Sequence, residues 1–283
     1  MSLEQRIEKL AAESDASKLG TDAYKTLEEL LDQLEAGLLR SAARDGDGNW
    51  RAVPWVKRGI LLGFRIGHLA NMSVPETGQR YRFSFVDKHT YPARQFTEKD
   101  GVRIVPGGSS IRRGAHIASG VVCMPPMYVN VGAYVGAGTM IDSHALVGSC
   151  AQIGERVHLS AAAQIGGVLE PVNASPVIIE DDALVGGNCG VYEGTVVRRK
   201  AVLAAGVVLT RGTPVYDLVK ERVIRGDAQH PLEIPEGAVV VPGARAVSSP
   251  WGSENGLSLQ TPVIVKYRDE KTDVATALEA WLR

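Results

Sequence analysis

The 283-residue sequence is poor in aromatic side chains and cysteine, and it contains no long apolar run. Only 6% of its residues are Phe, Trp or Tyr, and its three cysteines form no CxxC pair. An odd, small number of cysteines argues against a disulfide framework and indicates a reducing compartment. No stretch reaches the ~18–20 apolar residues that cross a bilayer, and the opening MSLEQRIEKL has no signal-peptide core. We therefore expect a cytoplasmic protein that has no membrane partner.

Clusters of charge and the common catalytic motifs are also lacking. The formal net charge is −1 and no basic block occurs, so nucleic acid is not an expected partner. The motifs GxxxxGK[ST], GxSxG and HExxH are missing, which leaves phosphate-loop, hydrolase and zincin chemistry without support. His116, His144 and His158 are separated by 28 and 14 residues, without the close pair of a β-helical carbonic anhydrase zinc site. We expect no metal site.

What the sequence does contain is an aliphatic residue at every sixth position. The period fits neither the 3.6 residues of an α-helix nor the 2 of a simple strand. It is the hexapeptide signature of a parallel β-helix, in which each hexad forms one flat face of a triangular coil. Cys123 occupies one inward position, so we expect it to pack in the core. The positions in phase are Val105, Ile111, Ile117, Cys123, Val129, Val135, Ile141, Val147, Ile153, Leu159, Ile165, Ile179, Val185, Val191, Val197, Leu203, Leu209 and Val215.

Residues 1–100 are expected to form a helical N-terminal domain. Apolar residues from Leu27 to Leu38 fall on one helical face, and residues 4–12 predict a shorter helix before it. Residues 43–49 read as a loop, and Trp50–Ile66 as a short helix. This domain either caps the first coil or reaches the site of a neighbouring subunit.

The β-helix is predicted over residues 101–246, with two interruptions. About eight residues are looped out within 166–178, and a hairpin is inserted at 216–233. Loops on a repeating scaffold are common binding positions. Residues 247–283 should add a C-terminal strand at Thr261–Tyr267 and a helix at Thr272–Leu282. The open ends and flat faces of a solenoid favour cyclic association, and we expect a homotrimer.

Several segments of the repeat region carry a specific resemblance. The stretch Met124–Gly154, with VHLS at 157–160 and IGGVLEP at 165–171, resembles the tetrahydrodipicolinate N-succinyltransferases, a family of hexapeptide-repeat acyltransferases. The resemblance implies a left-handed β-helix and trimers with sites between subunits. It also implies transfer of succinyl from succinyl-CoA to tetrahydrodipicolinate, hydrated to 2-amino-6-oxopimelate, in the diaminopimelate route to lysine.

The same resemblance assigns roles to individual residues. Asp142 matches the family aspartate that contacts the acceptor amine and helps to remove its proton. The residue follows inward-facing Ile141, so its carboxylate should point outward. Arg103 matches the arginine that binds an acceptor carboxylate, a role that suits the guanidinium fork.

One family position is changed in this sequence. A glutamate proposed to act with the aspartate is replaced by Gly190, whereas the following family glutamate is matched by Glu193. Glu193 is therefore a catalytic candidate beside Asp142, and its alternative role is to stabilise a corner. Either the second carboxylate is dispensable, or Glu193, His144 or water takes its place.

The resemblance implies succinyl-CoA as a co-substrate, and we expect no permanently bound group. The small residues Ala204, Ala205 and Gly206 resemble the coils along which related enzymes lay the pantetheine arm, yet small residues suit any coil. Arg198, Arg199 and Lys200 either meet CoA phosphates or are ordinary surface charge. Two alternatives stay open: an acetyl-CoA-dependent enzyme on the same or a related acceptor, and, disfavoured because Arg103 and Asp142 are both present, a catalytically silent scaffold.

Overall fold

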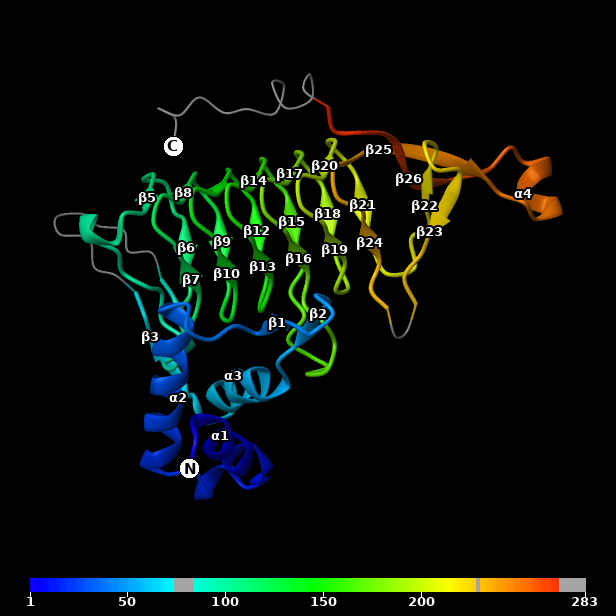
Figure 1. Ribbon diagram of the computed structural model, residues 1–283. Helices are drawn as coiled ribbons and strands as arrows, with labels where there is room; N and C mark the ends of the chain where they lie inside the picture. The colour runs from blue at the N-terminus through cyan, green and yellow to red at the C-terminus, as the bar shows by residue number, and fades with distance from the viewer. Residues whose placement is uncertain (74–83, 228–229, 270–283) are drawn as a thin grey trace.

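The computed structural model describes residues 1–73, 84–227 and 230–269, and it consists of a stack of triangular coils with a helical segment on one side (Figure 1). The coils are built from three parallel sheets, which we call the first, second and third sheet. The first sheet contains β7 (His116–Ile117), β10 (Tyr134–Val135), β13 (Gln152–Ile153), β16 (Ile178–Ile179), β19 (Val196–Val197) and β24 (Glu233–Ile234). The second contains β5 (Arg103–Ile104), β8 (Val122–Cys123), β11 (Met140–Ile141), β14 (His158–Leu159), β17 (Leu184–Val185) and β20 (Val202–Leu203). The third contains β6 (Ser110–Ile111), β9 (Tyr128–Val129), β12 (Leu146–Val147), β15 (Gln164–Ile165), β18 (Gly190–Val191) and β21 (Val208–Leu209).

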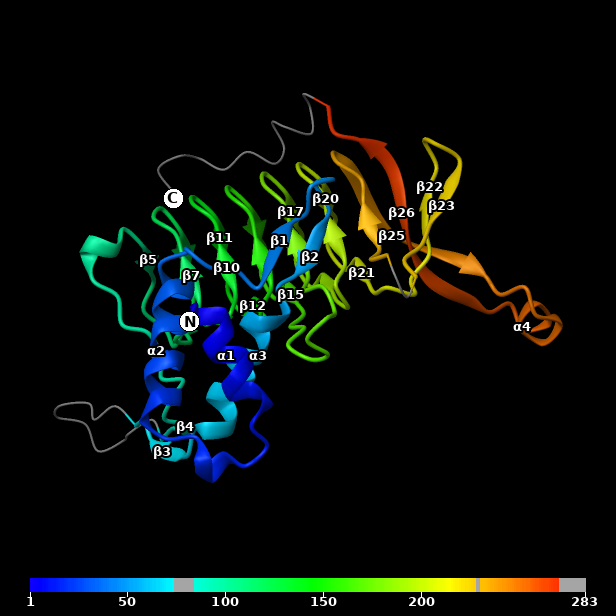
Figure 2. The ribbon, with the colours of Figure 1, turned by 60° about the horizontal axis from the view of Figure 1, so that its bottom comes forward.

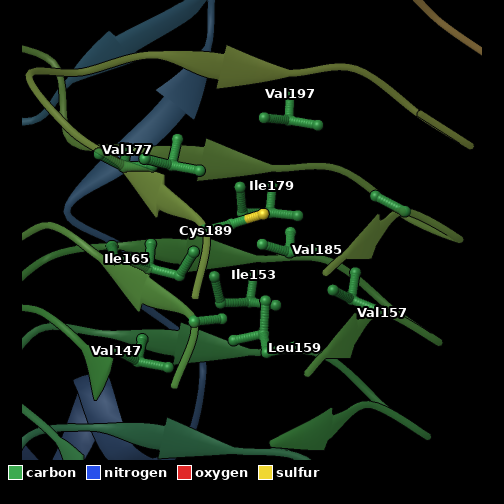
Figure 3. Close-up of a cluster of buried hydrophobic side chains, with 14 of the residues drawn as sticks. Val147, Ile153, Val157, Leu159, Ile165, Val177, Ile179, Val185, Cys189 and Val197 are labelled. Carbon is green, nitrogen blue, oxygen red and sulfur yellow. The ribbon is translucent and has the colours of Figure 1, made fainter. Parts of the chain in front are cut away.

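The three-faced prism predicted from the hexads is confirmed by the register of the strands. Met140 pairs with His158, a separation of 158 − 140 = 18 residues, which is three hexads. From Ile111 onward the aliphatic residue of each hexad points inward, and Figure 3 shows such side chains filling the interior between the sheets. In the first coil the prediction of Val105 was wrong by one residue, since Ile104 pairs with Cys123 and packs against the core. Cys123 is fully buried among them.

Turns between strands form three edges of the prism, and we name each by one of its residues. The Asp142 edge joins the second sheet to the third, the Glu193 edge joins the third to the first, and the Asp181 edge joins the first to the second. At many turns one residue has a left-handed backbone conformation, for which glycine is best suited, as at Gly138.

The two interruptions of the hexads lie at coil turns. Gln152 pairs with Ile178, 26 residues away, so the coil carries eight residues beyond the usual 18. Val196 pairs with Glu233, 37 residues away, and the extra chain includes the antiparallel strands β22 (Val215–Asp217) and β23 (Arg222–Ile224). The hairpin therefore begins one residue before the predicted insertion.

The N-terminal segment contains the expected helices, together with short strands that were not predicted. Its helices are α1 (Leu3–Ala12), α2 (Thr21–Glu35) and α3 (Pro54–Ile66), with short 3-10 turns at Ala16–Lys18 and Glu98–Asp100. Two strand pairs accompany them: β1 (Ala42–Arg44) with β2 (Trp50–Ala52), and β3 (Leu69–Asn71) with β4 (Val86–Lys88). The long helix ends at Glu35, so Leu38 lies outside it and is 76% exposed. Trp50, predicted to begin a helix, lies in strand β2, and the helix begins at Pro54.

This segment packs against the first sheet and the Glu193 edge. The apolar face of α2 buries Leu27, Leu30 and Leu31, and Gly59 lets α3 approach it closely, since a Cβ there would lie 2.4 Å from Leu30. Strands β1 and β2 lie beside the coils (Figure 2), where Ala42 and Trp50 cover Ile178 and Val196. The N-terminal segment therefore covers the outer face of the first sheet.

The C-terminal part contains the predicted final coil and strand, with different bounds. Val240 is the last inward residue, pairing with Leu203, and strand β25 (Ala238–Ala246) then leaves the coil to pair antiparallel with β26 (Ser258–Tyr267). The solenoid thus ends before Ala246, because inter-strand pairing in the arm replaces coil packing. A short helix, α4 (Pro250–Glu254), lies where a loop was expected, capped by Ser249. The predicted helix at 272–282 is outside the described residues. Among those described, no helix has the length and apolar character needed to cross a bilayer.

Candidate functional site

Asp142 is the first residue of the turn after β11 and faces outward on the Asp142 edge. Its backbone N–H donates to the Leu159 carbonyl at 2.9 Å, which fixes the turn in the ladder. Its Oδ1 accepts the Ser143 backbone N–H at 2.7 Å. Within the described chain, Oδ2 has no protein donor, and the side chain is half-buried. One carboxylate oxygen therefore holds the turn and the other is available to a ligand.

An equivalent turn on another edge clarifies the role of that first oxygen. Asn130 follows Val129 as Asp142 follows Ile141, and its Oδ1 accepts the Val131 N–H at 2.8 Å. Stabilising the turn needs only one side-chain oxygen and no charge. A negative charge at position 142 is consequently not required by the fold.

Arg103 lies in β5, which belongs to the same sheet as β11. The side chain is exposed and β5 is two strands from β11, about 10 Å at ~4.8 Å per strand. The structure therefore places Arg103 and Asp142 on neighbouring parts of one surface. That spacing suits an elongated ligand with an anionic end. His144 belongs to the same turn as Asp142 and is exposed, so it also borders this surface.

Ala204, Ala205 and Gly206 follow β20 and lie on the same edge as Asp142, three coils away. At the second position of three successive turns on this edge are Ala161, Gly187 and Ala205. Their backbone N–H groups have no acceptor among the described residues. A row of free amides can donate hydrogen bonds to a long polar chain, and small side chains leave room for that chain. In the sequence, this row is visible only as a small residue at the second position of each of these three turns. The backbone N–H groups without an acceptor are revealed by the turn geometry alone.

Glu193 is not brought to Asp142. It lies on the Glu193 edge after β18, is exposed, and accepts the Arg211 backbone N–H at 3.1 Å. Its backbone is left-handed, with φ 54°. This contact provides a local structural role, and within one chain the two carboxylates face different sides of the prism.

Gly190 faces outward on the third sheet beneath an aromatic ring. A Cβ at position 190 would lie 2.5 Å from Cε2 and 2.8 Å from Oη of Tyr192. A Cβ at Gly166 would meet the same ring at 2.7 Å. The ring of Tyr192 therefore occupies the space that a side chain at 190 would need, a feature the sequence alone did not reveal.

The basic run 198–200 lies on the Asp181 edge, at the opposite end of β20 from Ala204. Arg198 pairs with Glu180 at 3.0 Å and with Glu233 at 2.7 Å, and Arg199 pairs with Asp182 at 3.4 Å. Both guanidinium groups thus have carboxylate partners, which favours the surface-charge interpretation of this run over phosphate binding.

The cysteines are poor nucleophiles. All three are free and buried, and burial raises the pKa of Cys123 to about 12 and that of Cys150 to about 11. A thiolate is the reactive form, so neither thiol suits covalent catalysis at neutral pH. Within the described residues, no three His, Cys, Asp or Glu side chains are grouped closely enough to hold a metal ion.

Comparison with known proteins gives consistent relatives. The family model for the tetrahydrodipicolinate N-succinyltransferase N-terminal region matches residues 2–66, and that for the hexapeptide repeat of succinyl-transferase matches residues 176–211. A 2,3,4,5-tetrahydropyridine-2,6-dicarboxylate N-succinyltransferase from Rhodopseudomonas palustris is 42% identical over 258 residues, covering 91% of this chain and 89% of that protein. The enzyme of the same name from Chelativorans is 39% identical over 283 residues, covering 99% and 97%.

One solved structure is also similar in fold. A protein from Campylobacter jejuni described as a 2,3,4,5-tetrahydropyridine-2-carboxylate N-succinyltransferase superposes with a TM-score of 0.51 at 19% identity. The match covers 89% of this chain and 64% of that one. At this identity the likeness concerns the fold alone, and with the repeat match it identifies the coils as a left-handed β-helix.

Proposed function

Because the chain belongs to the tetrahydrodipicolinate N-succinyltransferase family, we infer that it transfers a succinyl group to the amino group of tetrahydrodipicolinate in diaminopimelate and lysine biosynthesis. It is an acyltransferase, with succinyl-CoA as the donor we propose. The acceptor reacts in its hydrated, open form, 2-amino-6-oxopimelate, which carries two carboxylates and one amine.

The observation that carries the proposal is the layout of the Asp142 edge. A carboxylate oxygen without a protein partner lies at one end of a row of free backbone N–H groups that leads to Ala205. Arg103 lies on the adjoining second sheet, two strands from the strand that precedes Asp142. The edge and this sheet thus offer a proton acceptor, an anion-binding group and a track for a polar chain.

We propose that Asp142 is the general base. The acceptor amine attacks the thioester carbon, a C–N bond forms, the C–S bond breaks, and CoA leaves as a thiolate. The amine loses a proton to Oδ2 of Asp142, and the carboxyl group returns it to the departing sulfur. Arg103 binds one acceptor carboxylate through its guanidinium fork and holds the amine in line.

The pantetheine arm of the donor is proposed to run along the small turns. The N–H groups of Ala161, Gly187 and Ala205 are about 4.8 Å apart per coil, and a pantetheine chain has two amide carbonyls that can accept from them. Ala204 and Gly206 leave room for that chain. In this scheme no acyl-cysteine forms, in keeping with the raised pKa of the cysteine thiols.

The role of a second carboxylate is assigned differently from the sequence expectation. The Glu193 side chain has a backbone partner in Arg211 on another edge, so we propose that it stabilises the turn between β18 and β19. Asp142 then acts without it, with His144 or water available at the same turn for relay of the proton.

The working form is proposed to be a cytoplasmic homotrimer. Because the N-terminal segment covers the first sheet, the third sheet and the Asp142 edge remain for neighbouring subunits. Val208, which lies on the third sheet, is 38% exposed. A flat outer face on a solenoid is a suitable surface for cyclic association.

The donor is tested directly. Purified protein is incubated with the acceptor and either succinyl-CoA or acetyl-CoA, and thiol release and product mass are followed. Release with succinyl-CoA at least tenfold above acetyl-CoA is the expected result. Preference for acetyl-CoA would overturn the donor assignment, and release with neither would overturn the proposed activity.

A further inference from the structure

A second site candidate lies on the Asp181 edge, away from Asp142. A cavity of about 270 Å³ opens between the N-terminal segment and the first sheet, lined by Arg40, Trp50, Tyr134, Gln152 and Asp181 among others. This volume is below the ~300–1,000 Å³ typical of pockets for drug-sized ligands, which suits a smaller molecule. The proposed acyl transfer uses none of these residues.

Arg40 is held rigidly in this cavity. Its guanidinium carbon lies 3.8 Å from the ring centroid of Tyr134 and 5.3 Å from that of Trp50. Its Nε donates to Oε1 of Gln152 at 2.8 Å. Gln152 is itself buried and fixed, since its Nε2 donates to the Ser41 hydroxyl at 2.9 Å. The fork of Arg40 therefore has a defined orientation before any ligand arrives.

No carboxylate in the described chain pairs with Arg40, and its two terminal nitrogens have no acceptor there. Burial lowers the pKa of this arginine, the physical sign that its charge is poorly solvated. A partly buried guanidinium usually has a carboxylate or phosphate partner. The geometry thus leaves a planar fork open to an anion.

Most other charges lining the cavity already have partners. Arg44 pairs with Glu180 at 2.9 Å, Arg199 pairs with Asp182, and Glu155 pairs with Arg156 at 2.8 Å. Asp181 is different. Its Oδ1 accepts the Glu155 backbone N–H at 2.8 Å, while its Oδ2 has no partner among the described residues.

Arg40 and Asp181 are therefore two opposite charges left over in one cavity. The charge of Asp181 acts on Arg40, yet the pair forms no ion pair within 4.0 Å. A ligand between them would need an anionic group for Arg40 and a cationic group for Asp181. A phosphate meets only the first need and is repelled by Asp181 and Glu155.

We propose that this cavity binds a free α-amino acid. The ligand carboxylate takes the two terminal nitrogens of Arg40, and the ammonium group donates to Oδ2 of Asp181. The ring of Trp50 and the ring edge of Tyr134 border the cavity and contact the ligand side chain; the faces of the Tyr134 ring are covered by Arg40 and His116. This is a binding site on a different edge of the prism from the acyl-transfer residues, and no reaction occurs in it.

The test is calorimetric titration of the full-length protein with each of the twenty standard L-amino acids and, separately, with inorganic phosphate. At least one amino acid should bind and phosphate should not. Arg40→Gln and Asp181→Asn should each weaken that binding at least tenfold. Asparagine keeps the oxygen that accepts the Glu155 N–H, so this variant should fold normally. The matched control is Glu155→Gln, which lines the same cavity but removes a charge that is already paired, and it should change affinity less than twofold.

Two further variants make the result decisive. Arg40→Lys keeps the positive charge but loses the fork, so it should weaken binding even if Arg40→Gln unfolds. Asp142→Asn should retain amino-acid binding, because its change lies on another edge. Binding lost in Asp142→Asn would mean that the ligand occupies the acyl-transfer site. Binding unchanged in both Arg40 and Asp181 variants, phosphate binding that displaces the amino acid, or no binding of any amino acid would each overturn the proposal.

Discussion

The carboxylates of Asp142 and Glu193 lie on different edges of the same prism. Asp142 follows β11 in the second sheet, whereas Glu193 follows β18 in the third, two coils farther along the stack. Within one chain they cannot contact the same ligand atom. Only residues from two subunits could therefore bring both carboxylates to one substrate, and variants of each residue distinguish that arrangement from catalysis by Asp142 alone.

Asp142→Asn should lower kcat/KM by ~10²–10⁴, the usual effect of losing a general base. The melting temperature should not change, because asparagine at the equivalent position 130 makes the same turn contact. Thiol release and thermal melts measure the two quantities. A variant that keeps more than half of wild-type kcat/KM would show that Asp142 only stabilises its turn.

Glu193→Gln should keep most of the turnover. The amide oxygen can still accept the Arg211 N–H, so the free energy of unfolding should fall by less than ~1 kcal/mol. The same thiol-release assay applies. A loss of activity as large as that of Asp142→Asn would mean that Glu193 reaches the site of a neighbouring subunit.

Gly190→Glu should destabilise the protein and should not raise turnover. The new side chain must displace the ring of Tyr192, and such overpacking costs ~1–3 kcal/mol. Stability should recover when Tyr192→Ala is added to the same variant, as measured by denaturant unfolding. If either variant gained orders of magnitude in kcat, the native protein would lack a group that the reaction needs.

Stability should fall as the pH drops below about 6.5. Burial, with nearby Arg94 and Arg40, lowers the pKa of His116 below its ordinary 6.5, despite a hydrogen bond to the Glu35 carbonyl. The unfolded chain takes up the proton first, so acid favours unfolding. In thermal melts between about pH 5 and about pH 8, His116→Gln should show a smaller change than wild type. An identical pH profile in the variant would contradict this assignment.

The protein should be a trimer in dilute solution. Light scattering should give three times the chain mass, and dilution that produces monomers should lower activity. A monomer with full activity would exclude a site shared between subunits.

The coil architecture was predictable because six-residue periodicity directly reflects an inward-facing side chain in every strand. Counting residues between Ile165 and Ile179 also gave the size of the loop, and the register of Gln152 with Ile178 agrees with it. The predicted helix extended too far, to Leu38, because the apolar spacing continues past Glu35, where α2 ends. The predicted boundary at Ala246 lies close to the end of the coils, because Val240 is the last inward residue before β25 continues into the arm.

The candidate site was only partly visible in the sequence. The outward direction of Asp142 follows from inward Ile141, and its alignment with Ala204 follows from a whole number of coils between them. The cavity around Arg40 and Asp181 was not predictable, because it depends on how the N-terminal segment crosses the first sheet. Likewise, no sequence pattern showed that Tyr192 covers Gly190.

The closure of the first sheet by the N-terminal segment has a consequence for the order of folding. Arg44 and Trp50 donate to Glu180, respectively 136 and 130 residues later in the chain, and Ser41 donates to the Cys150 carbonyl, 109 residues later. Contacts of such long sequence separation form late, since the intervening chain must first be ordered. During synthesis this segment is translated before the coils that it contacts, which follow it by more than a hundred residues. It is thus made before those coils and is among the last parts to reach its native contacts.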